Sequence, residues 1–128
     1  GSRLSMLMAV LGQRGRVKVG DQDVYASAAG GAKLTEPGLD LGICLAVASA
    51  MHDIPLPADM AVFGEVGLGG EVRQVGRAPR RVTEAARLGF RRIIVPAKSP
   101  EPDDGLDGVR LLRVSTLVEA LREAGLNQ

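Results

Sequence analysis

Apolar residues recur with the period of a helix in three segments of the chain. Residues 3–14 carry leucines and methionines at helical spacing. Residues 41–51 are apolar almost all round, which favours a helix buried on most of its sides, and Pro37 suits the start of that helix. Residues 79–88 begin with a proline and place one apolar stripe inward. A further helix is predicted where Thr116 stands three residues before a glutamate, the spacing of a capping box.

Short apolar runs bounded by glycine or proline predict strands between these helices. We expect strands at residues 23–29, 60–63, 92–95 and 109–114, and a tight hairpin of two short strands within the glycine-rich residues 64–72. Helices that alternate with short strands indicate the α/β fold class.

The length and composition of the chain fit a single domain. Of the 128 residues we assign 3–128 to this domain, and residues 1–2 are typical of a remnant of cloning. Hydrophobic residues make up 45% of the chain, but only Tyr25, Phe63 and Phe90 are aromatic, so the core must be built from aliphatic side chains. No apolar run approaches the ~20 residues that a membrane-spanning helix needs.

Cysteine and histidine each occur once, as Cys44 and His52. One cysteine cannot form an internal disulfide, and neither residue has the partners that a zinc site requires. We expect Cys44 to be buried within the apolar helix, and His52 to lie at the end of that helix, where a cation suits the helix dipole. This cysteine usage is typical of a reducing, cytoplasmic compartment.

Charge is segregated along the chain, although its net value is only +1. Residues 72–98 contain eight basic residues and one acid, whereas the acidic residues 99–108 predict a solvated loop. Arginines in and around the predicted helix 79–88 are candidate DNA-binding residues, because such a face can contact phosphates without reading sequence. They are Arg73, Arg77, Arg80, Arg81, Arg87 and Arg91, of which Arg80, Arg87 and Arg91 recur at helical spacing.

Two other interpretations of these arginines stay open. They could pair with acidic loops of a neighbouring subunit, or they could form a solvated face with no role. Aromatic residues that could stack on single-stranded bases are nearly missing, so we expect contact with the DNA backbone only.

The order of short motifs between residues 35 and 96 resembles the Lon-type protease domain. In active members a Gly-Pro-Ser-Ala-Gly turn opens a buried helix and supplies the nucleophilic serine, and a later Gly-Gly-Leu-Lys turn supplies the lysine base. The resemblance implies a Lon-protease-type α/β fold, with helices packed on a mixed sheet. The corresponding segments here are Glu36-Pro37-Gly38-Leu39-Asp40, Ile54-Pro55, Phe63-Gly64-Glu65-Val66 and Val75-Gly76-Arg77-Ala78-Pro79.

The serine and lysine of that family are both missing from this chain. When Gly64-Glu65 is aligned with the Gly-Glu of the family, Gly38 stands at the serine position and Pro79 at the lysine position. A shift of one residue would place Leu39 at the serine position instead. None of these side chains can act as a nucleophile or as a base.

Two other pairs of polar residues are candidate catalytic groups. Ser27 and Lys33 have no supporting context, and Glu65 and Glu71 are explained as turn residues next to Arg73. We therefore expect no catalytic residue, and a residual serine peptidase of the Lon type stays as an alternative.

These substitutions fit the RadA (Sms) family of bacterial recombination factors, whose C-terminal domain is of the Lon type. Six segments resemble that family in order and cover most of residues 3–96. They are Arg3-Leu4-Ser5, Gly-Asp-Gln-Asp-Val-Tyr at 20–25, Thr35-Glu36-Pro37, Val-Phe-Gly-Glu-Val-Gly-Leu at 62–68, Glu-Ala-Ala-Arg-Leu-Gly-Phe at 84–90, and Pro96.

The resemblance implies a fragment of a longer chain, without the zinc finger and the RecA-like ATPase of the family. ATP, Mg and Zn are expected only in those missing domains, because this chain has no Gly-Lys-Ser/Thr phosphate loop and no cysteine cluster. The implied function is a non-proteolytic scaffold and DNA-binding domain of an ATP-dependent motor in homologous recombination, DNA repair and branch migration. Implied partners are DNA phosphates, further copies in a hexameric ring, and RecA through the full-length protein. A pure protein-docking or oligomerisation module is the other alternative.

Overall fold

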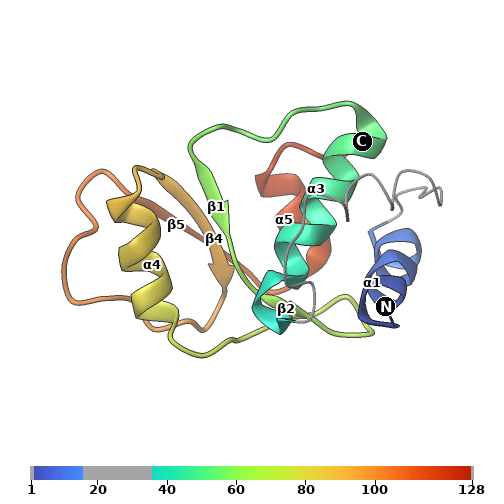
Figure 1. Ribbon diagram of the computed structural model, residues 1–128, viewed down its shortest axis with the longest axis horizontal. Helices are drawn as coiled ribbons and strands as arrows, with labels where there is room; N and C mark the ends of the chain where they lie inside the picture. The colour runs from blue at the N-terminus through green and yellow to red at the C-terminus, as the bar shows by residue number, and fades with distance from the viewer. Residues whose placement is uncertain (1, 16–35, 128) are drawn as a thin grey trace.

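The computed structural model describes residues 2–15 and 36–127. The strand predicted at residues 23–29 and the pair Ser27 and Lys33 lie outside these residues. In chain order the elements (Figure 1) are α1 (Ser2–Gln13), η1 (Pro37–Leu39), α3 (Asp40–His52), β1 (Met60–Val62), β2 (Glu65–Val66), β3 (Val72–Arg73), α4 (Ala78–Arg87), β4 (Arg92–Pro96), β5 (Arg110–Val114) and α5 (Leu117–Glu123).

The predicted helices are confirmed, with boundaries shifted by only a residue or so. Pro37 begins the 3-10 turn η1, and α3 itself begins at Asp40. The capping box of α5 is formed as predicted. Thr116 Oγ1 accepts a hydrogen bond from the Glu119 amide at 3.1 Å, and Glu119 Oε1 accepts one from the Thr116 amide at 3.1 Å.

The described strands form two separate sheets. In the first, β1, β4 and β5 are parallel in that order, with Ile93 of β4 opposite Ala61 of β1 and Leu111 of β5. In the second, β2 and β3 form the predicted antiparallel hairpin. One bridge, from Glu71 to Thr116, ties the hairpin to the residue that caps α5, just after β5. The parallel and antiparallel pairings expected in one mixed sheet are therefore divided between two sheets in this part of the chain.

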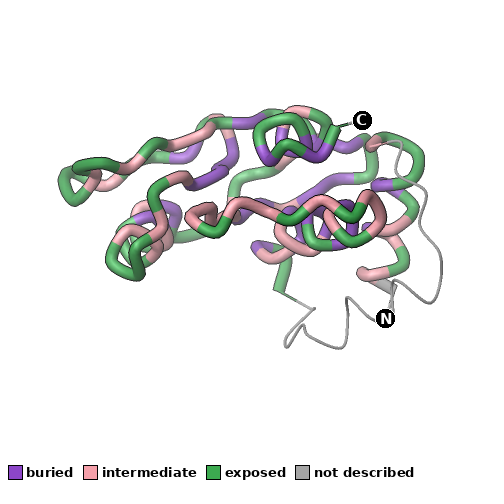
Figure 2. Tube along the Cα trace, turned by 90° about the horizontal axis from the view of Figure 1, so that it is seen from above, coloured by how far each residue is buried: buried purple, intermediate pink, exposed green. Residues whose placement is uncertain are grey.

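Helices cover both faces of the parallel sheet. Figure 1 shows α4 on one side of the sheet and α1, α3 and α5 on the other. The side chains of β4 alternate accordingly: Ile94 packs with α1, α3 and α5, while Ile93 and Val95 pack with Val82 of α4. Burial on both faces makes the strand a continuous apolar run, as is usual for parallel sheets. Figure 2 shows the buried positions along the sheet and on the inward sides of the helices.

A buried carboxylate anchors α1 to the rest of the domain. Asp40, at the first position of α3, has no solvent exposure. Its side chain accepts hydrogen bonds from Arg3 Nε at 2.7 Å, from Arg3 Nη2, and from the Val66 amide at 3.0 Å. Arg3 Nη2 also reaches Glu65 at 3.3 Å. Glu65 and Glu71 both lie beside Arg73, as expected: Glu65 stands opposite Arg73 in the hairpin, and Glu71 pairs with it at 2.7 Å. The ion pair of Glu65 itself is with Arg3 of α1.

The single cysteine is buried, as expected. Cys44 is fully buried in α3, and burial followed by the charge of Asp40 raises the pKa of its thiol to about 12. Among residues 2–15 and 36–127, no helix is long and apolar enough to cross a membrane.

Candidate nucleic-acid interface

Helix α4 carries three of the six candidate DNA-binding arginines and begins in an unusual way. Pro79 stands in its first turn, where the missing N–H costs nothing, and Ala78 and Val82 bury its inner side. The residue before the helix, Arg77, has a left-handed backbone conformation with φ 64°. That conformation costs roughly 1–3 kcal/mol for a residue with a Cβ. An exposed arginine is thus held where a glycine would be relaxed.

The six candidate arginines divide into two groups. Arg73 pairs with Glu71, Arg87 pairs with Glu84, and Arg81 donates to Glu36 at 3.2 Å and to the Gly76 carbonyl at 2.9 Å. The other three are exposed and form no ion pair with any residue in the described parts of the chain. They are Arg77, Arg80 and Arg91.

Arg91 does not continue the helical face, contrary to the expected spacing. Helix α4 ends at Arg87, and Gly89 follows with φ 99°, so the chain has turned before it reaches Arg91. The Arg91 amide donates to the Asp59 carbonyl at 2.9 Å, which places this residue at the start of β4. Arg80 and Arg87, seven residues apart, do share one side of the helix.

Glu84 offsets part of the positive charge on α4. The Arg87 guanidinium holds the pKa of Glu84 below its usual value through a hydrogen bond, and the charge of Arg80 lowers it further. The carboxylate therefore stays ionised at neutral pH. Since this carboxylate already bonds Arg87, Arg77 and Arg80 are left without an ion pair among the described residues.

Arg81 is held inside a small network instead of reaching into solvent. Its guanidinium carbon lies 5.9 Å from the centre of the Phe63 ring, within cation–π distance. The same guanidinium lies against Gly38, where an added Cβ would be 3.2 Å from Arg81 Nη1. Gly38 is the position at which the Lon resemblance expects a serine. Arg81 therefore lies against the position that the resemblance assigns to that serine.

An open groove of about 440 Å³ lies between α4, β1 and η1. Arg77, Arg80 and Arg81 stand along it, and most of its lining is apolar. Leu88 is 61% exposed at its edge. The remaining lining residues are Gly38, Leu39, Ala61, Val62, Phe63, Glu84, Ala85 and Phe90.

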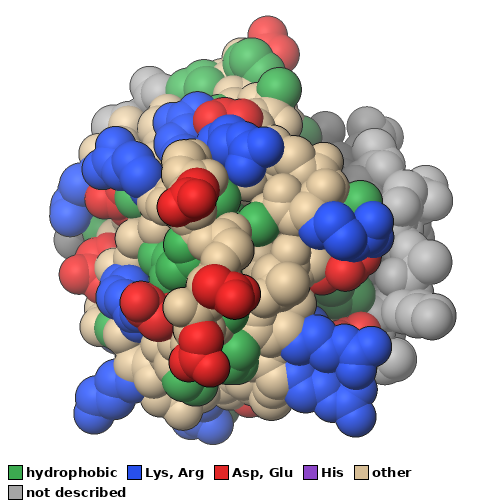
Figure 3. All heavy atoms as spheres, turned by 90° about the vertical axis from the view of Figure 1, so that its left-hand side faces the viewer, with side chains coloured by type: hydrophobic (Ala, Val, Ile, Leu, Met, Phe, Trp, Pro, Cys, Tyr) green, Lys and Arg blue, Asp and Glu red, His purple; other side chains and the backbone are tan. Residues whose placement is uncertain are grey.

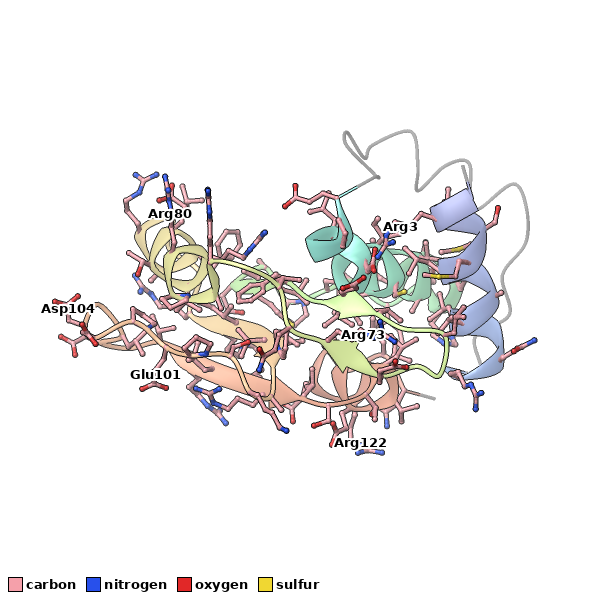
Figure 4. The ribbon with its side chains drawn as sticks, turned by 90° about the horizontal axis from the view of Figure 1, so that it is seen from below. Arg3, Arg73, Arg80, Glu101, Asp104 and Arg122 are labelled. Carbon is pink, nitrogen blue, oxygen red and sulfur yellow. The ribbon has the colours of Figure 1, made fainter. Side chains whose placement is uncertain are left out.

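The surface at this end of the molecule is not uniformly basic. Figure 3 shows basic and acidic side chains interspersed, with hydrophobic patches between them. The acidic loop 99–108 lies near α4 because its Leu106 packs with Val82 in the same apolar cluster. Figure 4 shows Arg80 pointing away from the side on which Glu101 and Asp104 lie. Arg80 thus lies on the opposite side of this end from these two acidic residues.

Sequence reasoning missed the groove and the ion pairs that neutralise some arginines. The pair of Glu84 and Arg87 could have been predicted, because residues three apart on a helix are neighbours. The apolar lining had no such signal, since it joins residues from separate elements. Within residues 2–15 and 36–127, no group of three or more His, Cys, Asp or Glu side chains gathers as metal ligands would.

Comparison with known proteins gives two kinds of match. A family model described as "Subunit ChlI of Mg-chelatase" matches residues 25–99. The DNA repair protein RadA of Escherichia coli K12 is 46% identical over 120 residues, 94% of this chain and 26% of that protein. RadA of Bacillus subtilis 168 is 47% identical over 122 residues, with the same shares. RadA of Mycobacterium tuberculosis H37Rv is 43% identical over 121 residues, 94% of this chain and 25% of that protein.

The chain spans about a quarter of the length of these curated relatives. The match to the family model includes β1, α4 and the groove between them. The chain therefore belongs to the ChlI family, and along almost its entire length it is a homologue of the RadA DNA repair proteins.

Proposed function

We propose that this chain is a DNA-binding scaffold domain of a RadA-type motor in recombination, DNA repair and branch migration. The observation that carries the proposal is that Arg77 and Arg80, at the start of α4, are both exposed, line the same groove and have no described carboxylate partner. The relatives over 94% of the chain are named DNA repair proteins, which supports DNA as the ligand.

Contact with DNA would be made through backbone phosphates. Arginine presents a planar, permanently charged fork that binds phosphate oxygens in pairs. Arg91, exposed at the start of β4, and Arg87, once it exchanges Glu84 for a phosphate, would extend the contact. Few contacts of this kind give weak binding that falls steeply with salt. Such a domain would add affinity to a larger assembly instead of selecting a sequence.

We further infer a Lon-protease-type fold that has lost its catalytic dyad. The alternating elements, the buried helix α3 opened by η1, and the hairpin of β2 and β3 support this assignment. At the position inferred for the nucleophile, Gly38 is buried and offers no hydroxyl, and the Arg81 guanidinium lies against it. Pro79, inferred at the position of the base, stands in the first turn of α4 and has no amine.

The test is binding of a fluorescein-labelled 20-base-pair duplex, followed by fluorescence anisotropy at low salt. Arg77→Glu/Arg80→Glu should abolish binding, because it replaces two phosphate contacts by two repulsions. Arg110→Glu/Arg122→Glu makes the same change of charge at exposed residues outside the groove and should retain most of the affinity. Equal losses in both variants would mean that net charge alone drives binding. Full binding by the first variant would refute the proposed interface.

Self-association is a second candidate, and the placement of charge favours it. The acidic loop 99–108 and the arginines of α4 lie at the same end of the domain, so two copies could pair opposite charges across an interface. A scaffold role in a ring would require such contacts. Size-exclusion chromatography with light scattering, at low and at high salt, would give the mass of the protein in solution. A monomer at all salt concentrations and at high protein concentration would argue against it.

A further inference from the structure

We propose that the groove between α4 and β1 binds an unpaired base of single-stranded DNA, with the flanking phosphates on Arg77 and Arg80. This inference rests on the proposed DNA-binding function and goes beyond it, because contact with phosphates alone does not require a groove. It also revises the expectation of backbone contact only, which followed from the scarcity of aromatic residues.

The lining of the groove suits the apolar faces of a flat ring. Its volume of about 440 Å³ falls within the roughly 300–1,000 Å³ of sites that bind small organic ligands. Phe63 and Phe90 both line it, although the whole chain has only three aromatic residues. Leu88, 61% exposed at its edge, would lose contact with water when a base enters.

The charges around the groove suit the two phosphates that flank such a base. Arg77 and Arg80 are exposed and have no described carboxylate partner, so they are available to anions. Glu84 is the acidic residue of the lining, and its carboxylate is bonded to Arg87. A ligand with an apolar centre and anionic ends therefore fits better than an acidic peptide or a neutral metabolite.

Arg81 gives the groove a planar cationic wall. Its guanidinium is fixed by the Gly76 carbonyl, by Glu36 and by the Phe63 ring. A guanidinium plane held in this way can stack on a base, as in proteins that recognise single strands. In a duplex the bases are stacked inside the helix and cannot enter, so the groove would distinguish single strands from duplexes.

The experiment compares three labelled DNAs by fluorescence anisotropy. They are an oligothymidine, a strand of equal length in which the central nucleotides are abasic, and a duplex of equal length. The oligothymidine and the abasic strand carry the same phosphates, so a difference between them reports the bases. Stacking of a base is worth about 1–3 kcal/mol, so the abasic strand should bind roughly 5- to 150-fold more weakly.

Ala85→Leu fills the groove without a change of charge and should lower oligothymidine affinity to that of the abasic strand. Leu88→Ser, at an exposed edge position, removes apolar surface with little risk to folding and should have a smaller effect in the same direction. Ala46→Leu makes the matched change at an exposed position of α3 and should bind like the unmodified protein.

The outcomes separate this inference from the proposed function. Equal affinity for oligothymidine and the abasic strand would overturn the base site while leaving phosphate binding intact. No binding of any of the three DNAs would overturn both. If Ala85→Leu leaves the difference between the two strands unchanged but dissociates an oligomer, the groove is a contact between copies of this chain and the inference is wrong.

Discussion

Replacing Arg3 of the Arg3–Asp40 ion pair should cost the domain more stability than replacing Asp40. Asp40 is completely buried, whereas the side chain of Arg3 is 28% exposed. Arg3→Met leaves a buried carboxylate with the Val66 amide as its remaining donor. Removing one partner of a buried pair costs about 3–5 kcal/mol of stability. Because water reaches the Arg3 site, we expect a loss at the lower end of this range, about 3 kcal/mol.

Asp40→Asn should cost less, although it breaks the same pair. The asparagine oxygen still accepts from the Val66 amide, and the guanidinium of Arg3 can turn to Glu65, 3.3 Å away, or to water. The expected loss is that of a hydrogen bond to a charged group, about 1.5 kcal/mol. In Arg3→Met/Asp40→Asn no charge is buried, so this double variant should be more stable than Arg3→Met alone.

Urea unfolding followed by circular dichroism measures these three free energies. For a domain of this size each kcal/mol shifts Tm by roughly 3–4 °C, so Arg3→Met should melt about 10 °C lower. The reasoning is refuted if Asp40→Asn loses as much stability as Arg3→Met, or if the double variant loses more than Arg3→Met. Either result would mean that the burial of the carboxylate does not set the energy of the pair.

Three further predictions concern single residues. The pKa of Cys44 is about 12 when folded against 9.0 when unfolded, so between pH 9 and pH 12 unfolding releases the thiol proton. The stability that this group contributes is fully present below pH 9 and declines toward pH 12, and the free energy of unfolding at pH 10 should be lower by about 1.4 kcal/mol. Cys44→Ala should remove this part of the pH dependence, which urea unfolding at several pH values would measure. Gly38→Ser should displace the Arg81 guanidinium slightly and leave the fold intact. The variant should not cleave casein, and a cleavage rate above that of the unmodified protein would contradict the loss of the dyad. Arg77→Gly should leave Tm unchanged or raised, because φ 64° suits glycine, yet weaken DNA binding in the anisotropy assay; a lowered Tm would show that the arginine is structural.

Most of the helices and strands could be predicted from residues at their own ends and turns. Pro79 and Gly89 bound α4, glycines mark the hairpin of β2 and β3, and the capping box marks α5. Each of these features depends on residues within one turn or one hairpin. A single sequence is therefore sufficient to place them.

The candidate site could be predicted only in part, because it depends on contacts between distant segments. The six arginines were identified by composition, but their partners were not. Arg81 bonds with Glu36, 45 residues earlier, and Arg3 with Glu65, 62 residues later. The groove likewise joins Ala61 of β1 to Leu88 after α4. The parallel pairing of β1 with β4 creates this proximity, and no local pattern encodes it.

The salt dependence of duplex binding tests the central claim most directly. The slope of log K against log salt concentration changes by about 0.9 for each phosphate contact in duplex DNA. Arg77→Gln/Arg80→Gln, which removes both charges without repulsion, should therefore make the slope less steep by about 2. Arg110→Gln/Arg122→Gln, with the same loss of charge outside the groove, should leave the slope unchanged. An unchanged slope in the first variant, or an equal change in both, would contradict an interface at the start of α4.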